Sequence, residues 1–110
     1  MANFELFWSE ANQNFYFRFK SNADNQLLKS EGYTGKSSCN NGIESVKKNA
    51  PLDGRYDRKG SSGHYTFNLK AANGEIIAMS SKTYETSSAR DAAIETIKKE
   101  APSASVVDLT

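Results

Sequence analysis

Hydrophobic and polar residues alternate strictly in two separate stretches of the chain, FYFRFK (15–20) and YTFNLK (65–70). Every second side chain in each stretch is apolar, and a period of two residues predicts a β-strand with one buried face. We expect Phe17 and Phe67 to lie on the buried side. Tyr16 and Thr66 then point to the opposite side of the sheet.

The same order of further signals follows each stretch. Asn-Gly at 73–74 predicts a tight hairpin before the short strand EIIAMS (75–80), whereas the first copy has the looser NADN (22–25) before QLLKS (26–30). Apolar residues then recur at helical spacing within 39–50 and 93–101. Ser38 and Ser88 are the expected N-caps, and a proline ends each helix.

The two helix endings are nearly the same sequence, IESVKKNAP (43–51) and IETIKKEAP (94–102). A repeat of this length holds one supersecondary unit, and one hairpin with one helix would bury too little apolar surface alone. The sequence therefore predicts an α+β fold of two tandem β-β-β-α-β repeats, residues 1–54 and 55–110, in a single compact domain. The repeats share one mainly antiparallel sheet with both helices on one face. RYDRK (55–59) and SVVDL (105–109) are the expected short strands after the helices.

Composition narrows the possible functions. The chain has 110 residues and a formal net charge of +1, which disfavours a dedicated polyanion-binding protein. Cys39 is the only cysteine, so no internal disulfide forms, and with His64 it makes a poor metal set. We expect no metal and no cofactor. No apolar run is long enough for a signal peptide or a membrane span, so we expect a cytoplasmic protein without membrane contact.

Candidate catalytic groups are few. Cys39 falls near a predicted helix N-terminus, which can favour a thiolate, but a small apolar residue in the helix seam is the preferred interpretation. His64 lacks a visible partner, and GSSG (60–63) lacks the residues of a phosphate-binding loop and is interpreted as a hairpin loop. We therefore expect no catalytic residues and no enzyme; a site recruited from scattered Tyr, Asn, Arg and Asp side chains is the least favoured alternative.

Several surface residues allow two interpretations. One group is basic and consists of the lysine pairs 47–48 and 98–99 with Arg55, Arg58 and Lys59. These side chains either form a basic surface or, as we favour, interact with the negative ends of the helix dipoles. Tyr33 and Tyr84 occupy equivalent positions, each before one of the two helices. They either contact a ligand or, in the interpretation that we favour, pack under the start of the helix. 

The face of the sheet without helices is the main candidate surface. Its predicted residues are Phe7, Tyr16, Arg18, Thr66, Asn68 and Lys70. Aromatic and cationic side chains on an open sheet can bind a partner or stack bases, although a solvated face with cross-strand pairs is also consistent. We take Tyr16, Arg18, Thr66 and Asn68 as candidate partner-binding residues. A protein partner is favoured over nucleic acid because the net charge is small.

The ordered motifs resemble a known family. An aromatic-x-Phe-x-aliphatic-Lys strand, Asn-Gly, Ser-x-x-Tyr and a helix ending like IESVKKNAP are similar to the YegP-like family of small bacterial proteins of unknown function. The resemblance implies one continuous sheet with C-terminal strands exchanged between repeats. It also implies a pseudo-dimeric monomer rather than a homodimer, because both copies lie in one chain. It implies no activity, ligand or catalytic residue. The leading hypothesis is a non-enzymatic binding or accessory module, and the alternative is a nucleic-acid-binding domain that uses the open sheet face.

Overall fold

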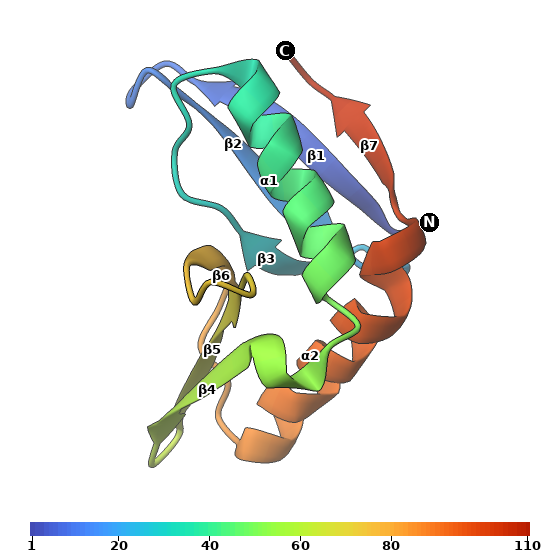
Figure 1. Ribbon diagram of the computed structural model, residues 1–110. Helices are drawn as coiled ribbons and strands as arrows, with labels where there is room; N and C mark the ends of the chain where they lie inside the picture. Colours follow the sequence, from blue (N-terminus) through green and yellow to red (C-terminus); the bar gives the residue numbers. More distant parts are fainter.

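The two alternating stretches form equivalent strands of a seven-stranded sheet in the computed structural model, which describes residues 1–110 (Figure 1). The strands are β1 (Asn3–Ser9), β2 (Asn14–Lys20), β3 (Gln26–Lys29), β4 (Tyr56–Ser61), β5 (His64–Lys70), β6 (Ile76–Ser80) and β7 (Ser105–Asp108). The helices are α1 (Lys36–Asn49) and α2 (Ser87–Glu100), and short 3₁₀ turns follow each of them at Asp53–Arg55 and Ala101–Ser103.

The sheet joins two similar halves edge to edge, in the strand order β4-β5-β6-β3-β2-β1-β7. Half one is β1, β2, β3 and α1, and half two is β4, β5, β6 and α2. The halves meet where β3 pairs with β6 in antiparallel fashion, with Leu28 opposite Ser80 and Lys29 opposite Met79. The predicted α+β fold of two tandem repeats is confirmed.

The strand exchange between the halves occurs once. After α2 the chain crosses back, and β7 pairs in parallel with β1 at the far edge of half one (Figure 1, red beside blue). After α1 the chain passes through Asp53–Arg55 directly into β4, which is the first strand of half two. The outer edge of β4 therefore has no neighbouring strand, in contrast to the edge of β1.

Both halves contribute to one hydrophobic core of 21 buried residues under the helices. The largest fully buried side chains include Phe4, Phe17, Phe19 and Phe67 from the strands. Ile43, Val46, Ile94 and Ile97 come from the helices and are also fully buried. Full burial of such a side chain contributes about 1.5–3 kcal/mol, so this shared core supplies the main driving force for joining the halves. Neither helix combines the length and apolar character that crossing a bilayer requires.

The two hairpin turns have the same geometry despite different sequences. In half two, Gly74 has a φ of 88°, and its N–H donates to the carbonyl of Ala71 at 3.0 Å. In half one, Asp24 takes the same place with a φ of 64°, and its N–H donates to Ser21 at 2.9 Å. Aspartate tolerates the left-handed region better than most residues. The NADN segment therefore makes a turn as tight as the Asn-Gly turn.

The helices begin earlier than the sequence suggested. Thr86, not Ser88, caps α2, because its Oγ1 accepts a hydrogen bond from the Ala89 N–H at 3.0 Å. Gly35 stands at the N-cap of α1 without a side-chain hydrogen bond, so the expected Ser38 cap is also wrong. The carboxylate of Asp91, in the second turn of α2, accepts hydrogen bonds from two arginines, Arg58 and Arg90.

Candidate functional site

The helix-free face of the sheet carries a row of side chains that are polar except for one methionine. Residues opposite each other in neighbouring strands point to the same side, and the register defines this row across six strands. The row is Asp57, Asn68, Met79, Lys29, Arg18 and Glu5. Two candidate residues, Arg18 and Asn68, thus share one row, with Lys29 and Met79 between them.

The other two candidates, Tyr16 and Thr66, lie on the same face in the adjacent row. Tyr16 is opposite Phe7 in half one, and Thr66 is opposite Lys59 in half two. All four candidate residues therefore lie on the helix-free face, but as two separate pairs.

Only the half-one pair lies at a hollow, which we name the Tyr16 hollow. It has a volume of about 310 Å³, and its lining includes Phe7, Asn12, Tyr16, Arg18, Gln26 and Lys29. The Phe7 and Tyr16 rings are stacked, with centroids 5.9 Å apart and an interplanar angle of 21°. The Arg18 guanidinium carbon lies 4.6 Å from the Phe7 ring centroid, within cation–π range. The Tyr16 hydroxyl accepts a hydrogen bond from Asn12 Nδ2 at 3.1 Å.

Charge in the Tyr16 hollow is divided between a paired and an unpaired cation. Arg18 Nε donates to Glu5 Oε1 at 2.6 Å, and Lys20 Nζ lies 3.5 Å from the same oxygen. The hydrogen bond from Arg18 lowers the pKa of Glu5, and partial desolvation opposes this effect. Lys29 is exposed and has no carboxylate within ion-pair distance. It is therefore the cation most available to a ligand.

Half two has no equivalent of the Tyr16 hollow. Lys59 stands at the register position of Phe7, and Thr66 stands at that of Tyr16. Asp57 is held by Lys59 at 3.3 Å and by Lys70 at 3.5 Å. None of the four hollows on the molecule is lined by Thr66 or Asn68. The replacement of two aromatic rings by Lys59 and Thr66 removes the walls that a hollow would need.

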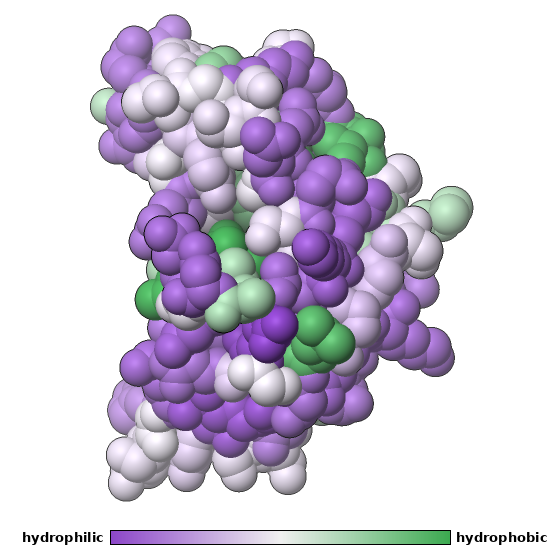
Figure 2. All heavy atoms as spheres, in the orientation of Figure 1, coloured by the Kyte–Doolittle hydropathy of each residue, from purple (hydrophilic) through white to green (hydrophobic).

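The helix side offers no comparable apolar surface. In Figure 2, hydrophobic residues form small separate spots among hydrophilic ones. Isolated exposed apolar residues are normal on soluble proteins and need no partner.

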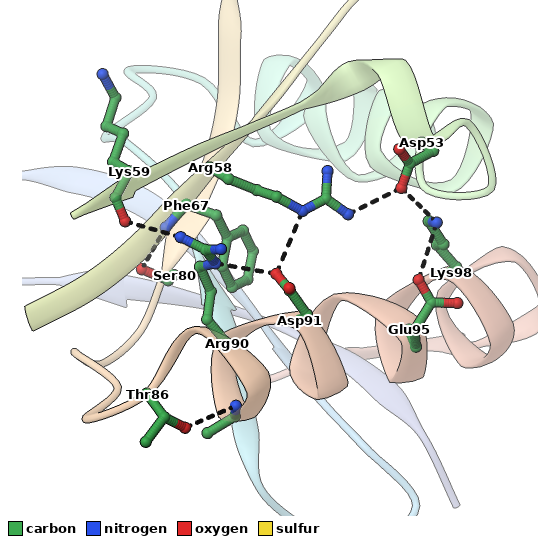
Figure 3. Close-up of polar contacts among 11 residues, drawn as sticks. Asp53, Arg58, Lys59, Phe67, Ser80, Thr86, Arg90, Asp91, Glu95 and Lys98 are labelled. Carbon is green, nitrogen blue, oxygen red and sulfur yellow. Dashed lines mark hydrogen bonds and ion pairs between the residues drawn. The ribbon is translucent and has the colours of Figure 1, made fainter. Parts of the chain in front are cut away.

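The less favoured alternative, a continuous basic surface, is interrupted at Arg58 and Lys59, which point to opposite faces of the sheet. Arg58 lies under α2, where it donates to Asp53 at 2.8 Å and to Asp91 at 3.3 Å (Figure 3). Lys98 donates to Asp53 at 2.6 Å. The hydrogen bonds from Arg58 and Lys98 lower the pKa of Asp53 to about 2. Arg58 and Lys98 are therefore engaged in ion pairs within the chain.

Arg90 completes this ion cluster. It is 9% exposed, and it donates to Asp91 at 3.0 Å and to the carbonyl oxygen of Lys59 at 3.1 Å (Figure 3). Its guanidinium carbon lies 5.3 Å from the Tyr65 ring centroid. The cluster ties α2 to β4 and leaves no open polar cavity, so we assign it a structural role.

The isolated candidate groups have structural surroundings. Cys39 is fully buried in the α1 seam, and burial raises the pKa of its thiol to about 11, which opposes thiolate formation. His64 is exposed at the start of β5. GSSG forms the β4–β5 hairpin, with positive φ at Gly60 and Gly63. No group of three or more His, Cys, Asp and Glu side chains is arranged to hold a metal ion.

Sequence analysis did not identify Asn12, Gln26 or Lys29 as part of the hollow. The available signal for Lys29 was the alternation within QLLKS, which directs the side chains of Leu28 and Lys29 to different faces of the sheet. Its position beside Arg18 depends on the β2–β3 register, which shifts at Phe19 and Lys20. Asn12 comes from a turn, where no periodicity applies.

Comparison with protein families gives a match to both repeats. The model of a family described as "Domain of unknown function (DUF1508)" matches residues 10–57 and again residues 61–108. The UPF0339 protein in the ptx operon 5' region of Stutzerimonas stutzeri is 47% identical over 98% of this chain and 96% of its own. The UPF0339 protein YegP of Escherichia coli K12 is 44% identical over 97% of this chain and 96% of its own. Neither relative is named for an enzymatic activity.

Solved structures agree with the architecture. The solution NMR structure of a UPF0339 protein from Shewanella oneidensis superimposes with a TM-score of 0.90 at 39% identity, covering 99% of this chain and 92% of that one. The solution NMR structure of YegP from E. coli, described as a protein of unknown function, gives a TM-score of 0.88 at 42% identity over 99% of this chain and 93% of that one. The chain, with its two copies of this domain, therefore belongs to the UPF0339, or YegP-like, family of bacterial proteins.

Proposed function

We propose that the protein is a non-enzymatic binding module that holds a segment of a cytoplasmic protein partner in the Tyr16 hollow. The observation that carries this proposal is an aromatic pair, Phe7 and Tyr16, beside Lys29, a cation without a carboxylate partner. Such a hollow suits an apolar or aromatic side chain with an acidic group close to it. The proposal includes no catalytic residue, metal or cofactor.

Charge on the helix-free face supports an acidic partner. Its strand residues include five cations, Arg18, Lys20, Lys29, Lys59 and Lys70, against the two carboxylates of Glu5 and Asp57. The whole chain carries only +1, so the rest of the molecule is on balance acidic. A positive face on a nearly neutral protein steers an acidic segment toward that face.

Nucleic acid is the second candidate, because the same cations and the Tyr16 ring could meet phosphates and a base. Two features favour protein. Arg18 is already paired with Glu5, so it is less available to a phosphate. Phe7 and Tyr16 stack on each other, so less ring surface is open to a flat base. A nucleic-acid ligand would show affinity for single-stranded oligonucleotides that falls steeply with salt.

The test compares equivalent positions of the two halves. Immobilised protein captures partners from a bacterial lysate, and each recovered partner is then titrated against the purified protein by NMR. We expect Tyr16→Ala with Arg18→Ala, and separately Lys29→Glu, to weaken binding at least tenfold. The matched Thr66→Ala with Asn68→Ala variant should bind as the wild type does.

The variants separate binding from folding, because Lys29 is exposed and its substitution leaves the core untouched. Unchanged binding in the Lys29→Glu variant and in the Tyr16/Arg18 variant would refute the site. Binding of oligonucleotides with a steep salt dependence, and of no protein, would favour the alternative function.

We further propose that residues 1–54 and 55–110 act as a single monomeric domain, because the second repeat occupies the place that a second chain would take. Light scattering should give the mass of one chain, 12.1 kDa. A stable mass of twice that value at micromolar concentration would contradict the proposal.

A further inference from the structure

The equivalent tyrosines before the two helices occupy different surroundings. In half one, Tyr33 stacks on Phe17, with ring centroids 6.3 Å apart and an interplanar angle of 23°. Tyr33 also crosses α1 at Gly42, where an added Cβ would clash with its hydroxyl oxygen. In half two, Ala93 stands at the position of Gly42 in the aligned helices. Tyr84 therefore cannot repeat the packing of Tyr33.

Tyr84 instead lies in a site where its polar group is not satisfied. The residue is 8% exposed, and its hydroxyl oxygen is buried without a hydrogen-bond partner. Burial raises the pKa of Tyr84, so the hydroxyl stays protonated and can donate. A buried donor without an acceptor is unfavourable, and an acceptor from water or a ligand would relieve it.

A cation accompanies this hydroxyl. The ammonium nitrogen of Lys82 lies 5.3 Å from the centroid of the Tyr84 ring. Lys82 is exposed and, like Lys29, has no carboxylate within ion-pair distance. An unpaired ammonium and a protonated hydroxyl are both donors suited to an anionic oxygen.

Tyr84 and Lys82 line a groove between the two halves, which we name the interhalf groove. Its volume is about 350 Å³, at the lower end of the range typical of small-molecule sites. Half one contributes the β2–β3 turn with Asn22 and Asn25, and half two contributes Thr96 and Glu100 of α2. Glu100 fixes the turn, because its Oε1 accepts a hydrogen bond from the Asn22 N–H at 2.7 Å. The groove is thus held in place by residues from both halves.

We propose that the interhalf groove binds a small organic anion, with a carboxylate or phosphate oxygen paired to Lys82 and, once the Lys82 side chain moves off the Tyr84 ring, hydrogen-bonded to the Tyr84 hydroxyl. The symmetry-related groove of half one also has a volume of about 350 Å³ and lies between α1 and the β5–β6 turn. Its lining includes Lys48 and Asn49 but no tyrosine. It lacks the buried donor and serves as an internal control.

The test is an NMR titration of the full chain with succinate, with inorganic phosphate and with succinamide as the uncharged control. We expect the anions to shift the signals of the Tyr84 ring and of the Ala93 and Asn25 amides, and succinamide to leave them unchanged. Tyr84→Phe and Lys82→Gln should each weaken anion binding at least tenfold. Tyr33→Phe, at the equivalent tyrosine, and Lys48→Gln, at the lysine of the control groove, should bind as the wild type does.

The two anions distinguish the ligand classes, because the tighter one identifies carboxylate or phosphate as the recognised group. The proposal fails if neither anion shifts these signals at about 10 mM, a concentration that would detect even millimolar affinity. It also fails if succinamide gives the same shifts, or if binding survives in both Tyr84→Phe and Lys82→Gln. Tyr84→Phe removes a single oxygen atom, so loss of binding with an unchanged amide spectrum elsewhere reports the site and not the fold.

Discussion

The two halves place different chemistry at the same position between the outer strand and the helix. In half one, Leu6 lies opposite Phe17 and is fully buried, and Cys39 of α1 is fully buried as well. In half two, Arg58 lies opposite Phe67 at the register position of Leu6. Arg90 aligns with Cys39 in the repeated helix. One half thus uses apolar packing where the other uses an ion cluster.

The strand exchange accounts for this difference. β7 covers the edge of β1 and keeps water from that side of half one, so an apolar seam is stable there. The edge of β4 has no neighbouring strand. Solvent therefore reaches Arg58, the helix-facing residue of β4, whose side chain is 30% exposed. Charged side chains on an open edge also oppose pairing with other chains. A single exchanged strand therefore makes two related units chemically unequal.

The largest expected difference between the halves comes from truncating these two equivalent residues. Leu6→Ala should lower the free energy of unfolding by about 2–5 kcal/mol, because it leaves a cavity under α1. Arg58→Ala should lower it by only about 1 kcal/mol, because its ion pairs are partly solvated. Chemical denaturation of both variants measures the contrast. Equal losses would show that the ion cluster is as important to stability as the apolar seam.

The fold could be predicted from sequence because its signals are local and occur twice. Alternation in FYFRFK and YTFNLK and the repeated helix endings each specify an element, and a second copy removes ambiguity. The inequality of the halves could not be predicted in the same way. Arg58 and Lys59 are adjacent in sequence, and only the pairing of β4 with β5 shows that they serve opposite faces.

The candidate site was predicted only in part. Alternation placed Tyr16 and Arg18 on the helix-free face, which is a local inference. The Tyr16 hollow, however, also needs Gln26 and Lys29 from β3, and their position depends on a register shift between strands. The interhalf groove depends on a contact between Asn22 and Glu100, which are remote in sequence, so no local pattern indicates it.

Deletion of residues 105–110 should make half one resemble half two, by opening the edge of β1. We expect a loss of about 1–3 kcal/mol in unfolding free energy, because Val106 and Val107 are each only partly buried. The exposed β1 edge should also promote self-association, since β1 carries one charged residue where β4 carries three in a row. Denaturation and light scattering report the two effects. The control is a deletion of Thr110 alone, which keeps β7 in place.

Acid should loosen the ion cluster of half two. The pKa of Asp53 is lowered to about 2 from its ordinary value of 3.8, so the stability it contributes is present above the ordinary value and is lost as the pH falls through about 2. Hydrogen bonds from Arg90 and Arg58 also lower the pKa of Asp91. Hydrogen exchange between about pH 4 and 2 should therefore show weaker protection of β4 and α2 as Asp53 and Asp91 become protonated, whereas the Arg18–Glu5 pair gives β1 and β2 an acid-sensitive contact of their own.

Asp53→Asn is the decisive variant for the acid response, because it removes the titrating group and keeps the shape of the side chain. We expect its stability to fall less steeply with acid over the same pH range than that of the wild type. An unchanged slope would mean that Asp53 contributes nothing to the acid sensitivity of half two.

The smallest expected effect concerns the two tyrosine hydroxyls. Tyr84→Phe removes a buried oxygen that has no hydrogen-bond partner, so it should leave the unfolding free energy unchanged or raise it by up to about 1 kcal/mol. Tyr33→Phe, at the equivalent place in half one, should change it by less than about 0.5 kcal/mol. Because the gain from Tyr84→Phe reflects an unmet donor, succinate or phosphate should reverse it by stabilising the chain that retains the hydroxyl more than the chain that lacks it. Thermal denaturation of the four combinations of variant and anion measures this reversal. Parallel responses in both tyrosine variants would show that the Tyr84 hydroxyl is satisfied by water and that the two halves do not differ there.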